Sequence, residues 1–119
     1  MDGHSSGITD VAFSPDGKLV ASASRDNDVI IWDVATGDEK HVLKGHSFSV
    51  YSVEFSPDGS KLVSAGWDHT FKVWDVDSGN MLVNVESGTG GFSVAAFSPK
   101  GQSVAAGCDD KSIYIAMLS

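Results

Sequence analysis

Apolar and polar residues alternate in short stretches along the chain, and turn-forming residues separate these stretches. Residues 11–13 alternate and lead into Ser-Pro-Asp-Gly at 14–17, where proline presets φ and glycine accepts a positive φ. Strands show a period of two and favour β-branched and aromatic residues, whereas no stretch shows the 3.6-residue period of a helix. The pattern predicts an all-β protein built from short strands and tight turns.

The same pattern returns at a constant step. Phe-Ser-Pro-Asp-Gly begins at Phe13 and again at Phe55, 42 residues on, and Phe-Ser-Pro-Lys-Gly begins at Phe97, another 42 residues on. A fixed period of roughly 40 to 45 residues indicates stacked units that cannot bury their apolar faces alone. The repeats are assigned to residues 3–44, 45–86 and 87–119, and the third is incomplete.

Each complete repeat predicts four strands, and the third repeat predicts three. In the first repeat the predicted strands cover 11–13, 18–24, 29–34 and 40–44. In the second they cover 49–55, 61–66, 71–76 and 81–86, and in the third 92–97, 103–108 and 112–118. The fourth strand of the first repeat is short and polar, as expected of an outer edge strand.

Two dipeptides also keep the step. They are Gly3-His4 with Gly45-His46, and Trp32-Asp33 with Trp74-Asp75. Together with the Phe-Ser-Pro-Asp-Gly turn, they resemble the signature of the WD-repeat β-propeller family, over essentially the whole chain. The resemblance implies three consecutive four-stranded antiparallel blades, the last without its outer strand. Because propellers have at least four blades, this is expected to be an open partial propeller.

The resemblance implies a hydrogen-bonded structural tetrad in each of the first two repeats. The members are His4, Ser22, Asp26 and Trp32, then His46, Ser64, Asp68 and Trp74. The carboxylate accepts from one histidine nitrogen, the other nitrogen meets the serine hydroxyl, and the hydroxyl accepts from the indole, so every buried polar group has a partner. The third repeat keeps only Asp110, with Gly88, Ala106, Ala116 and Met117 at the other signature positions. A softer third blade is expected, with Asp110 bonded to water alone.

Serine, histidine and aspartate together are also the catalytic set of many hydrolases. Here no Gly-x-Ser-x-Gly elbow is present, Ser22 stands in mid-strand among small residues, and the trio recurs at Ser64. Recurrence favours a structural role, so we expect no catalytic residues and no enzymatic activity from this stretch.

A metal site is not expected. The four histidines are His4, His41, His46 and His69; two have tetrad partners, and the others fall on an edge strand and a turn of different blades. Asp26-Asn27-Asp28 is similar to the start of a calcium loop, but no glycine follows at loop position six and no glutamate at position twelve. No cofactor is expected either.

The charge balance limits the classes of partner. The formal net charge is −8 and Arg25 is the only arginine, so a basic footprint for nucleic acid or anionic lipid is missing. No run of about 18 apolar residues predicts a membrane span. A single cysteine, Cys108, excludes an internal disulfide and suits a reducing compartment, so the cytoplasm or the nucleus is the expected location.

The resemblance also implies a protein-binding face. Its positions lie three and five residues after the Gly-His histidine and one residue before the tetrad aspartate. They are Gly7, Thr9 and Arg25, then Ser49, Tyr51 and Trp67, then Gly91, Ser93 and Asp109. Trp, Tyr and Arg dominate binding energy at interfaces. For Trp67 the alternative is packing against the neighbouring blade, and for Arg25 and Tyr51 it is a plain solvated surface.

The expected function is a non-catalytic protein–protein interaction scaffold, as a WD-repeat propeller or a fragment of one. Two alternatives stay open: a targeting propeller within a larger enzyme or signalling chain, and a unit that closes a ring by self-assembly through its apolar end blades. Expected partners are other proteins, together with the remaining blades of a parent chain or a second copy. Met1 begins inside the loop before the first strand, which favours truncation of a longer chain. Ala35 and Asp77 stand where receptors of cullin-type ligases carry arginine, so that role is not supported.

Overall fold

The computed structural model describes residues 2–118, which form eleven strands in three antiparallel sheets and no helix. The first sheet contains β1 (Ile8–Phe13), β2 (Leu19–Ser24), β3 (Val29–Asp33) and β4 (Glu39–Leu43). The second contains β5 (Val50–Phe55), β6 (Lys61–Gly66), β7 (Thr70–Asp75) and β8 (Met81–Glu86), and the third contains β9 (Phe92–Phe97), β10 (Ser103–Cys108) and β11 (Ile113–Met117). Each sheet lies within one repeat and follows chain order, which confirms the predicted three blades, the last with three strands.

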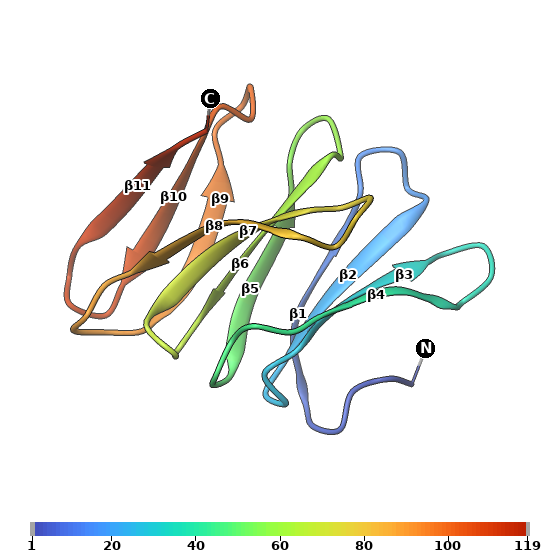
Figure 1. The fold of residues 1–119 in the computed structure, drawn as a ribbon, viewed down its shortest axis with the longest axis horizontal. Coiled ribbons are helices and arrows are strands. Elements are labelled where there is room, and N and C mark those ends of the chain that lie inside the picture. The colour runs from blue at the N-terminus through green and yellow to red at the C-terminus, as the bar shows by residue number, and fades with distance from the viewer. Residues whose placement is uncertain (1, 119) are drawn as a thin grey trace.

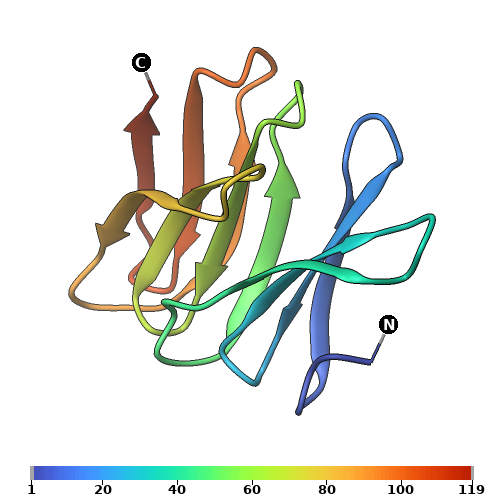
Figure 2. The ribbon, with the colours of Figure 1, turned by 45° about the vertical axis from the view of Figure 1, so that its right-hand side comes forward.

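The three blades are arranged as a fan. The first strands of the blades, β1, β5 and β9, are neighbours at the inner side, while the outer strands diverge (Figures 1 and 2). Successive blades differ in direction because each twisted sheet packs face to face on the next. The assembly measures 40 × 32 × 19 Å. Among the described residues, none forms a helix long and apolar enough to cross a membrane.

The hydrophobic core lies between the blades rather than within them. One cluster joins the first blade to the second, and a second cluster joins the second blade to the third. The first contains Ala21, Ala23, Val29, Ile31 and Leu43 on one side, with Val50, Val53, Phe55, Leu62, Trp74 and Val76 on the other. The second contains Val63, Ala65, Phe71 and Val73, facing Phe92, Ala95, Val104 and Ala106. Each blade therefore depends on its neighbours for burial.

Polar side chains also link the inner strands. An inner strand is an edge strand, so half of its N–H groups have no partner in its own sheet. Side chains of the preceding blade accept from them. The bonds run from Val53 N–H to Asp10 (3.0 Å), from Ala95 N–H to Ser52 (3.2 Å) and from Phe97 N–H to Glu54 (3.0 Å). These links were not part of the sequence prediction, because they depend on how neighbouring blades are placed.

Candidate functional site

The tetrad of the second blade is a closed hydrogen-bonded chain. His46 Nδ1 lies 2.9 Å from Asp68 Oδ2, and His46 Nε2 lies 2.7 Å from the Ser64 hydroxyl, which accepts from the Trp74 indole at 2.8 Å. The His46 and Asp68 side chains are 0% and 2% exposed. A neutral imidazole with its proton on Nδ1 satisfies every member, because the serine then donates to Nε2.

The first blade repeats this geometry. His4 Nδ1 lies 2.9 Å from Asp26, His4 Nε2 lies 2.6 Å from the Ser22 hydroxyl, and the Trp32 indole donates to that hydroxyl at 2.9 Å. Ser22 and Ser64 are both buried. A buried hydroxyl that already accepts from an indole is poorly placed to attack a substrate, which favours the structural interpretation of these residues.

The environment of Asp68 keeps its carboxylate charged. Burial by itself raises the pKa of Asp68, but hydrogen bonds from His46, the Thr70 hydroxyl and the Ser47 N–H outweigh it and hold the pKa at about 2. The tetrad is therefore intact at neutral pH and depends on a charge that acid removes.

Asp110 in the third blade is held by hydroxyl groups. The Thr89 hydroxyl donates to it at 2.9 Å and the Tyr114 hydroxyl at 3.2 Å, and the Ser112 N–H donates at 2.9 Å. The bond from Thr89 foremost, and those from Ser112, lower the pKa of Asp110 to about 2. The prediction that Asp110 needs only water is wrong. Its new partner Tyr114 comes from a position outside the tetrad, where the first blade has Ile30.

Lys72 occupies that same position in the second blade and was also missed. Its side chain is buried, and its ammonium donates to Asn84 at 2.6 Å. Burial lowers the pKa of Lys72, against the opposing charges of Asp68 and Glu86. A period-two pattern cannot distinguish a buried lysine from an exposed one, because only the stem length lets the ammonium reach a polar partner.

Three residues of the predicted binding face share one backbone feature. In each blade the first strand contains an extra residue opposite the second strand, and these residues are Thr9, Tyr51 and Ser93. A bulge turns the side chain out of the ladder and is enriched at functional edges. The bulge lies one residue into the first strand of each blade, so the three predicted positions occupy equivalent places in the three blades.

The rest of the predicted face is uneven in exposure. Arg25 and Asp109 are exposed, and the Ser93 hydroxyl lies 3.4 Å from the Asp109 carboxylate. Thr9 is half-buried and its hydroxyl donates to the Val50 carbonyl of the next blade. Ser49 is buried, with its carbonyl accepting from the Trp67 N–H, so it does not belong to an accessible face. That is a correction to the predicted set.

Trp67 is partly exposed and also packs against the neighbouring blade, so features of both interpretations from the sequence are present. Its side chain is 44% exposed. Its ring lies 5.1 Å from that of Tyr51 between centroids, and the angle between the planes is 41°. On another side it packs on the third blade, because a Cβ at Gly91 would lie 2.9 Å from the indole Cδ1. We call Tyr51, Trp67 and Gly91 the aromatic corner.

Phe48 adds an aromatic residue that the sequence analysis did not list. It is exposed, and it precedes Ser49, whose carbonyl holds the Trp67 backbone. Ser6 and Gly90 occupy the equivalent positions in the other repeats. A phenylalanine at this loop position, where the other repeats have small residues, was the sequence signal that could have identified it. Exposed aromatic side chains therefore gather near the second blade at this rim.

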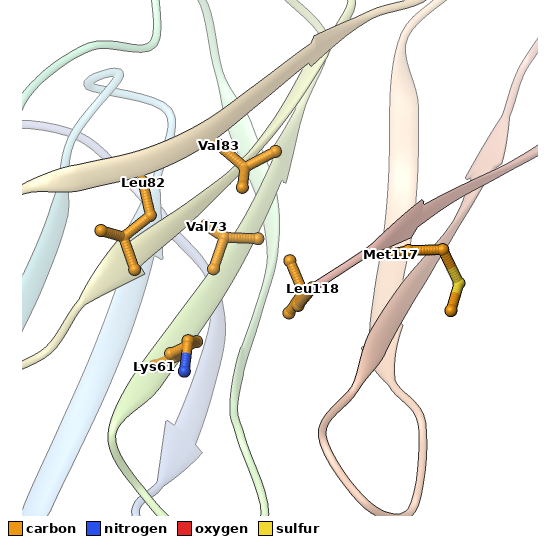
Figure 3. Close-up of a pocket in the computed structure, with 6 residues that line it drawn as sticks. All are labelled: Lys61, Val73, Leu82, Val83, Met117 and Leu118. Atoms are coloured by element: carbon orange, nitrogen blue, oxygen red, sulfur yellow. The ribbon is translucent and has the colours of Figure 1, made fainter.

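A groove lies away from this rim, between the second and third blades. Its volume is about 200 Å³, and Figure 3 shows its lining residues, with Val73, Leu82 and Val83 on the second blade and Leu118 facing them after β11. At the same place in the first junction, His41 meets the turn after β7, and its Nε2 donates to the Asp77 carbonyl at 2.8 Å. Val83, which lines the groove, is equivalent to His41, so the groove corresponds to the place that the turn after β7 fills in the first junction. Within residues 2–118 no group of three potential metal ligands is found.

Residues 1–33, 37–75 and 82–115 each match the family model described as "WD domain, G-beta repeat". The chain belongs to the WD40 repeat family. WD40 repeats characteristically form non-catalytic, protein-binding scaffolds, which gives this chain its general kind of function.

Local matches to three curated WD40 relatives are short. The chain is 51% identical over 37 residues to protein Mut11 of Chlamydomonas reinhardtii (31% of this chain, 10% of that protein) and 49% over 37 residues to WD repeat-containing protein SL1-17 of Schistosoma mansoni (31% and 12%). It is 56% identical over 34 residues to the probable serine/threonine-protein kinase PkwA of Thermomonospora curvata (29% and 5%). The matched segments span at most 12% of these relatives.

Proposed function

We propose that this WD40 chain is an interaction scaffold whose docking site is the aromatic corner. The observation that carries the proposal is the half-exposed indole of Trp67, fixed between Tyr51 and the Gly91 backbone. A large side chain that is already immobile loses little conformational entropy when a partner covers it. Tryptophan and tyrosine in such positions supply most of the binding energy at interfaces.

The charge around the corner indicates the chemistry of the partner. Asp109 is exposed, and its N–H donates to the carbonyl of Gly91, which lies under the indole. The whole chain carries a formal net charge of −8. A segment that offers an apolar side chain next to lysine or arginine would bury the indole and meet the acidic surface. The proposed setting is the cytosol or nucleus, which suits the free thiol of Cys108.

The test is a selection of short peptides on the immobilised chain, followed by calorimetric titration of the selected peptides. We expect peptides that combine an apolar residue with a basic one, and we expect Trp67→Ala to weaken their binding at least tenfold. Val42→Ala is the matched control, since Val42 is also exposed but lies on β4. Equal affinities for the two variants would refute the assignment of the corner.

A second candidate is the targeting propeller of a larger enzyme or signalling protein. It is favoured by the similarity to PkwA, whose name describes a probable serine/threonine-protein kinase. Reading the full open reading frame around this segment tests it. A catalytic domain in the same chain would support the targeting role, and its absence would leave the scaffold role alone.

A further inference from the structure

One residue leaves the backbone at the same place in each of the three blades, directly before the aspartate of the turn after the second strand. Its N–H donates to the carbonyl of the residue that precedes the first strand, at 2.9 to 3.0 Å in all three blades. These residues are Arg25, Trp67 and Asp109, all of them exposed, and we call them the rim row. They follow β2, β6 and β10, which succeed one another across the fan (Figure 1). Consecutive blades therefore present a positive charge, an indole and a negative charge.

Contacts between the blades make the rim row continuous. Thr9 of the first blade donates to the carbonyl of the residue before Tyr51, and the Tyr51 ring lies against that of Trp67. Trp67 in turn packs on Gly91, whose carbonyl accepts from the Asp109 N–H. The row thus runs from the first blade over the aromatic corner to the third blade.

The positions of the rim row stay accessible inside a blade junction. Arg25 and Trp67 each have a following blade beside them, and Trp67 is still 44% exposed although it packs on that blade. Further blades on either side would lengthen the row but would leave the order of these three members unchanged. The charge order therefore belongs to the three described blades and does not depend on what lies beyond them.

The two charged members of the rim row have no oppositely charged partner. Within residues 2–118, the ion pairs are formed by other side chains, and neither Arg25 nor Asp109 takes part in one. The Ser93 hydroxyl lies 3.4 Å from one oxygen of Asp109, a contact that leaves the charge in place. Opposite charges on the two sides of an exposed aromatic residue complement a ligand that is acidic at one end and basic at the other.

The step between blades limits the conformation of such a ligand. Packed sheets lie about 10 Å apart, so neighbouring members of the rim row are separated by about this distance. A polyproline II segment has three residues per turn and rises about 3.1 Å per residue, so every third side chain faces the same way at steps of about 9 Å. A β-strand repeats its side chains at steps of about 7 Å, which fits less well. Polyproline segments are also ordered before binding, and exposed aromatic side chains recognise them.

We infer that the rim row binds an extended, proline-rich segment of a partner protein with an acidic, an apolar and a basic side chain at every third position. The acidic side chain pairs with Arg25, the apolar one covers the indole of Trp67, and the basic one pairs with Asp109. The inference rests on the proposed docking role of the aromatic corner, and it adds the conformation and the charge order of the partner.

Calorimetric titration of the 119-residue chain with three synthetic proline-rich peptides tests the charge order. Each peptide has a central leucine, and the positions three residues before and after it carry glutamate and lysine, two lysines, or two glutamates. The mixed peptide is expected to bind roughly fivefold more tightly than either of the others. The difference is expected to shrink in about 1 M salt, which screens exposed charges.

Charge reversal at each end of the rim row assigns the two contacts. Arg25→Glu is expected to prefer the peptide with two lysines, and Asp109→Lys the peptide with two glutamates, because each variant repels the charge that the parent chain attracts. Lys100→Glu and Asp38→Lys make the same changes of charge on exposed turns at the opposite ends of the strands, so they are expected to keep the preference of the parent chain. Circular dichroism shows whether each variant is folded.

Three results would overturn the inference: no binding of the mixed peptide, equal affinities for the three peptides, or the same change of preference in Lys100→Glu as in Arg25→Glu. The docking role of the aromatic corner is judged separately, by the effect of Trp67→Ala on the peptides obtained by selection. A loss of affinity there, without any preference among the three synthetic peptides, would keep the corner and reject the charge order.

Discussion

The second and third blades have the same fold, and each has an aspartate in the turn after its second strand. The hydrogen-bond partners of this aspartate differ between the two blades. In the second blade, the side chain of Asp68 is 2% exposed and is joined to His46, Ser64 and Trp74 in a chain that crosses the sheet. In the third blade, Asp110 binds hydroxyl groups, one of them on the exposed Thr89. Buried polar groups are costly when stranded, whereas exposed ones turn to water. Position in the molecule, rather than the aspartate itself, therefore sets what each network contributes to stability.

The largest expected effect is from Ser64→Ala. It removes the acceptor of the Trp74 indole and the partner of His46 Nε2, and both groups are buried. The expected loss in the free energy of unfolding is about 2 to 4 kcal/mol, measured by urea denaturation. Ala106 already stands at this position in the third blade, so Ala106→Ser is the matched control and is expected to give no comparable gain. A loss below about 1 kcal/mol for Ser64→Ala would contradict the comparison.

The second largest expected effect is a loss of stability in acid, to which Asp68 contributes more than Asp110. The folded-state pKa of Asp68 is about 2, below its ordinary 3.8, so its contribution is complete above pH 3.8 and is lost as the pH falls toward 2. The loss amounts to roughly 2 kcal/mol because the carboxylate is almost fully buried. Thermal unfolding at pH 5, 4, 3 and 2 measures it.

Two variants assign that acid response. Asp68→Asn is expected to flatten the pH dependence, while Asp110→Asn changes it less, since Thr89 and Ser112 beside Asp110 are exposed and water screens its charge. The pKa of Asp110 is also lowered to about 2, so equal flattening by both variants would show that exposure does not distinguish the two blades.

Tyr114→Phe is expected to have a smaller effect. It removes a hydroxyl that donates to Asp110 at 3.2 Å, but it keeps the ring that packs edge-on against Phe92 at 5.2 Å. The expected loss is about 0.5 to 1 kcal/mol in urea denaturation, because Asp110 retains Thr89 and the Ser112 N–H. A loss as large as that of Ser64→Ala would mean that the third network is as essential as the second.

The smallest expected effect is a gain. Lys111 has a φ of 73°, in the left-handed region, at the position where the first blade has Asn27 with a φ of 75°. Asparagine tolerates this conformation better than lysine, so Lys111→Asn is expected to raise the free energy of unfolding by up to about 1 kcal/mol. The change lies on the exposed turn after β10, and the thermal midpoint measures it. An unchanged or lower midpoint would contradict this reading of the turn.

The local part of the fold was predictable from the sequence. The 42-residue step, the eleven strands and the turns after Phe13, Phe55 and Phe97 follow from alternation and from turn residues, which act over a few positions. The resemblance to WD repeats also implied the sets of side chains that the structure brings together around His4 and His46. Equivalent residues adopt the same local structure in each repeat, so the repeated pattern allows that structure to be predicted.

Contacts between repeats were decided only by the tertiary structure. Trp67 packs on Gly91, and Asp10 accepts from the Val53 N–H, so both contacts join residues of different blades. The burial of Ser49 depends on how closely the blades approach each other. The rescue of Asp110 by Tyr114 uses a side chain from outside the repeated pattern. Sequence alternation determines which face of a strand is apolar, but the distance and angle between packed sheets determine which polar atoms meet across that face.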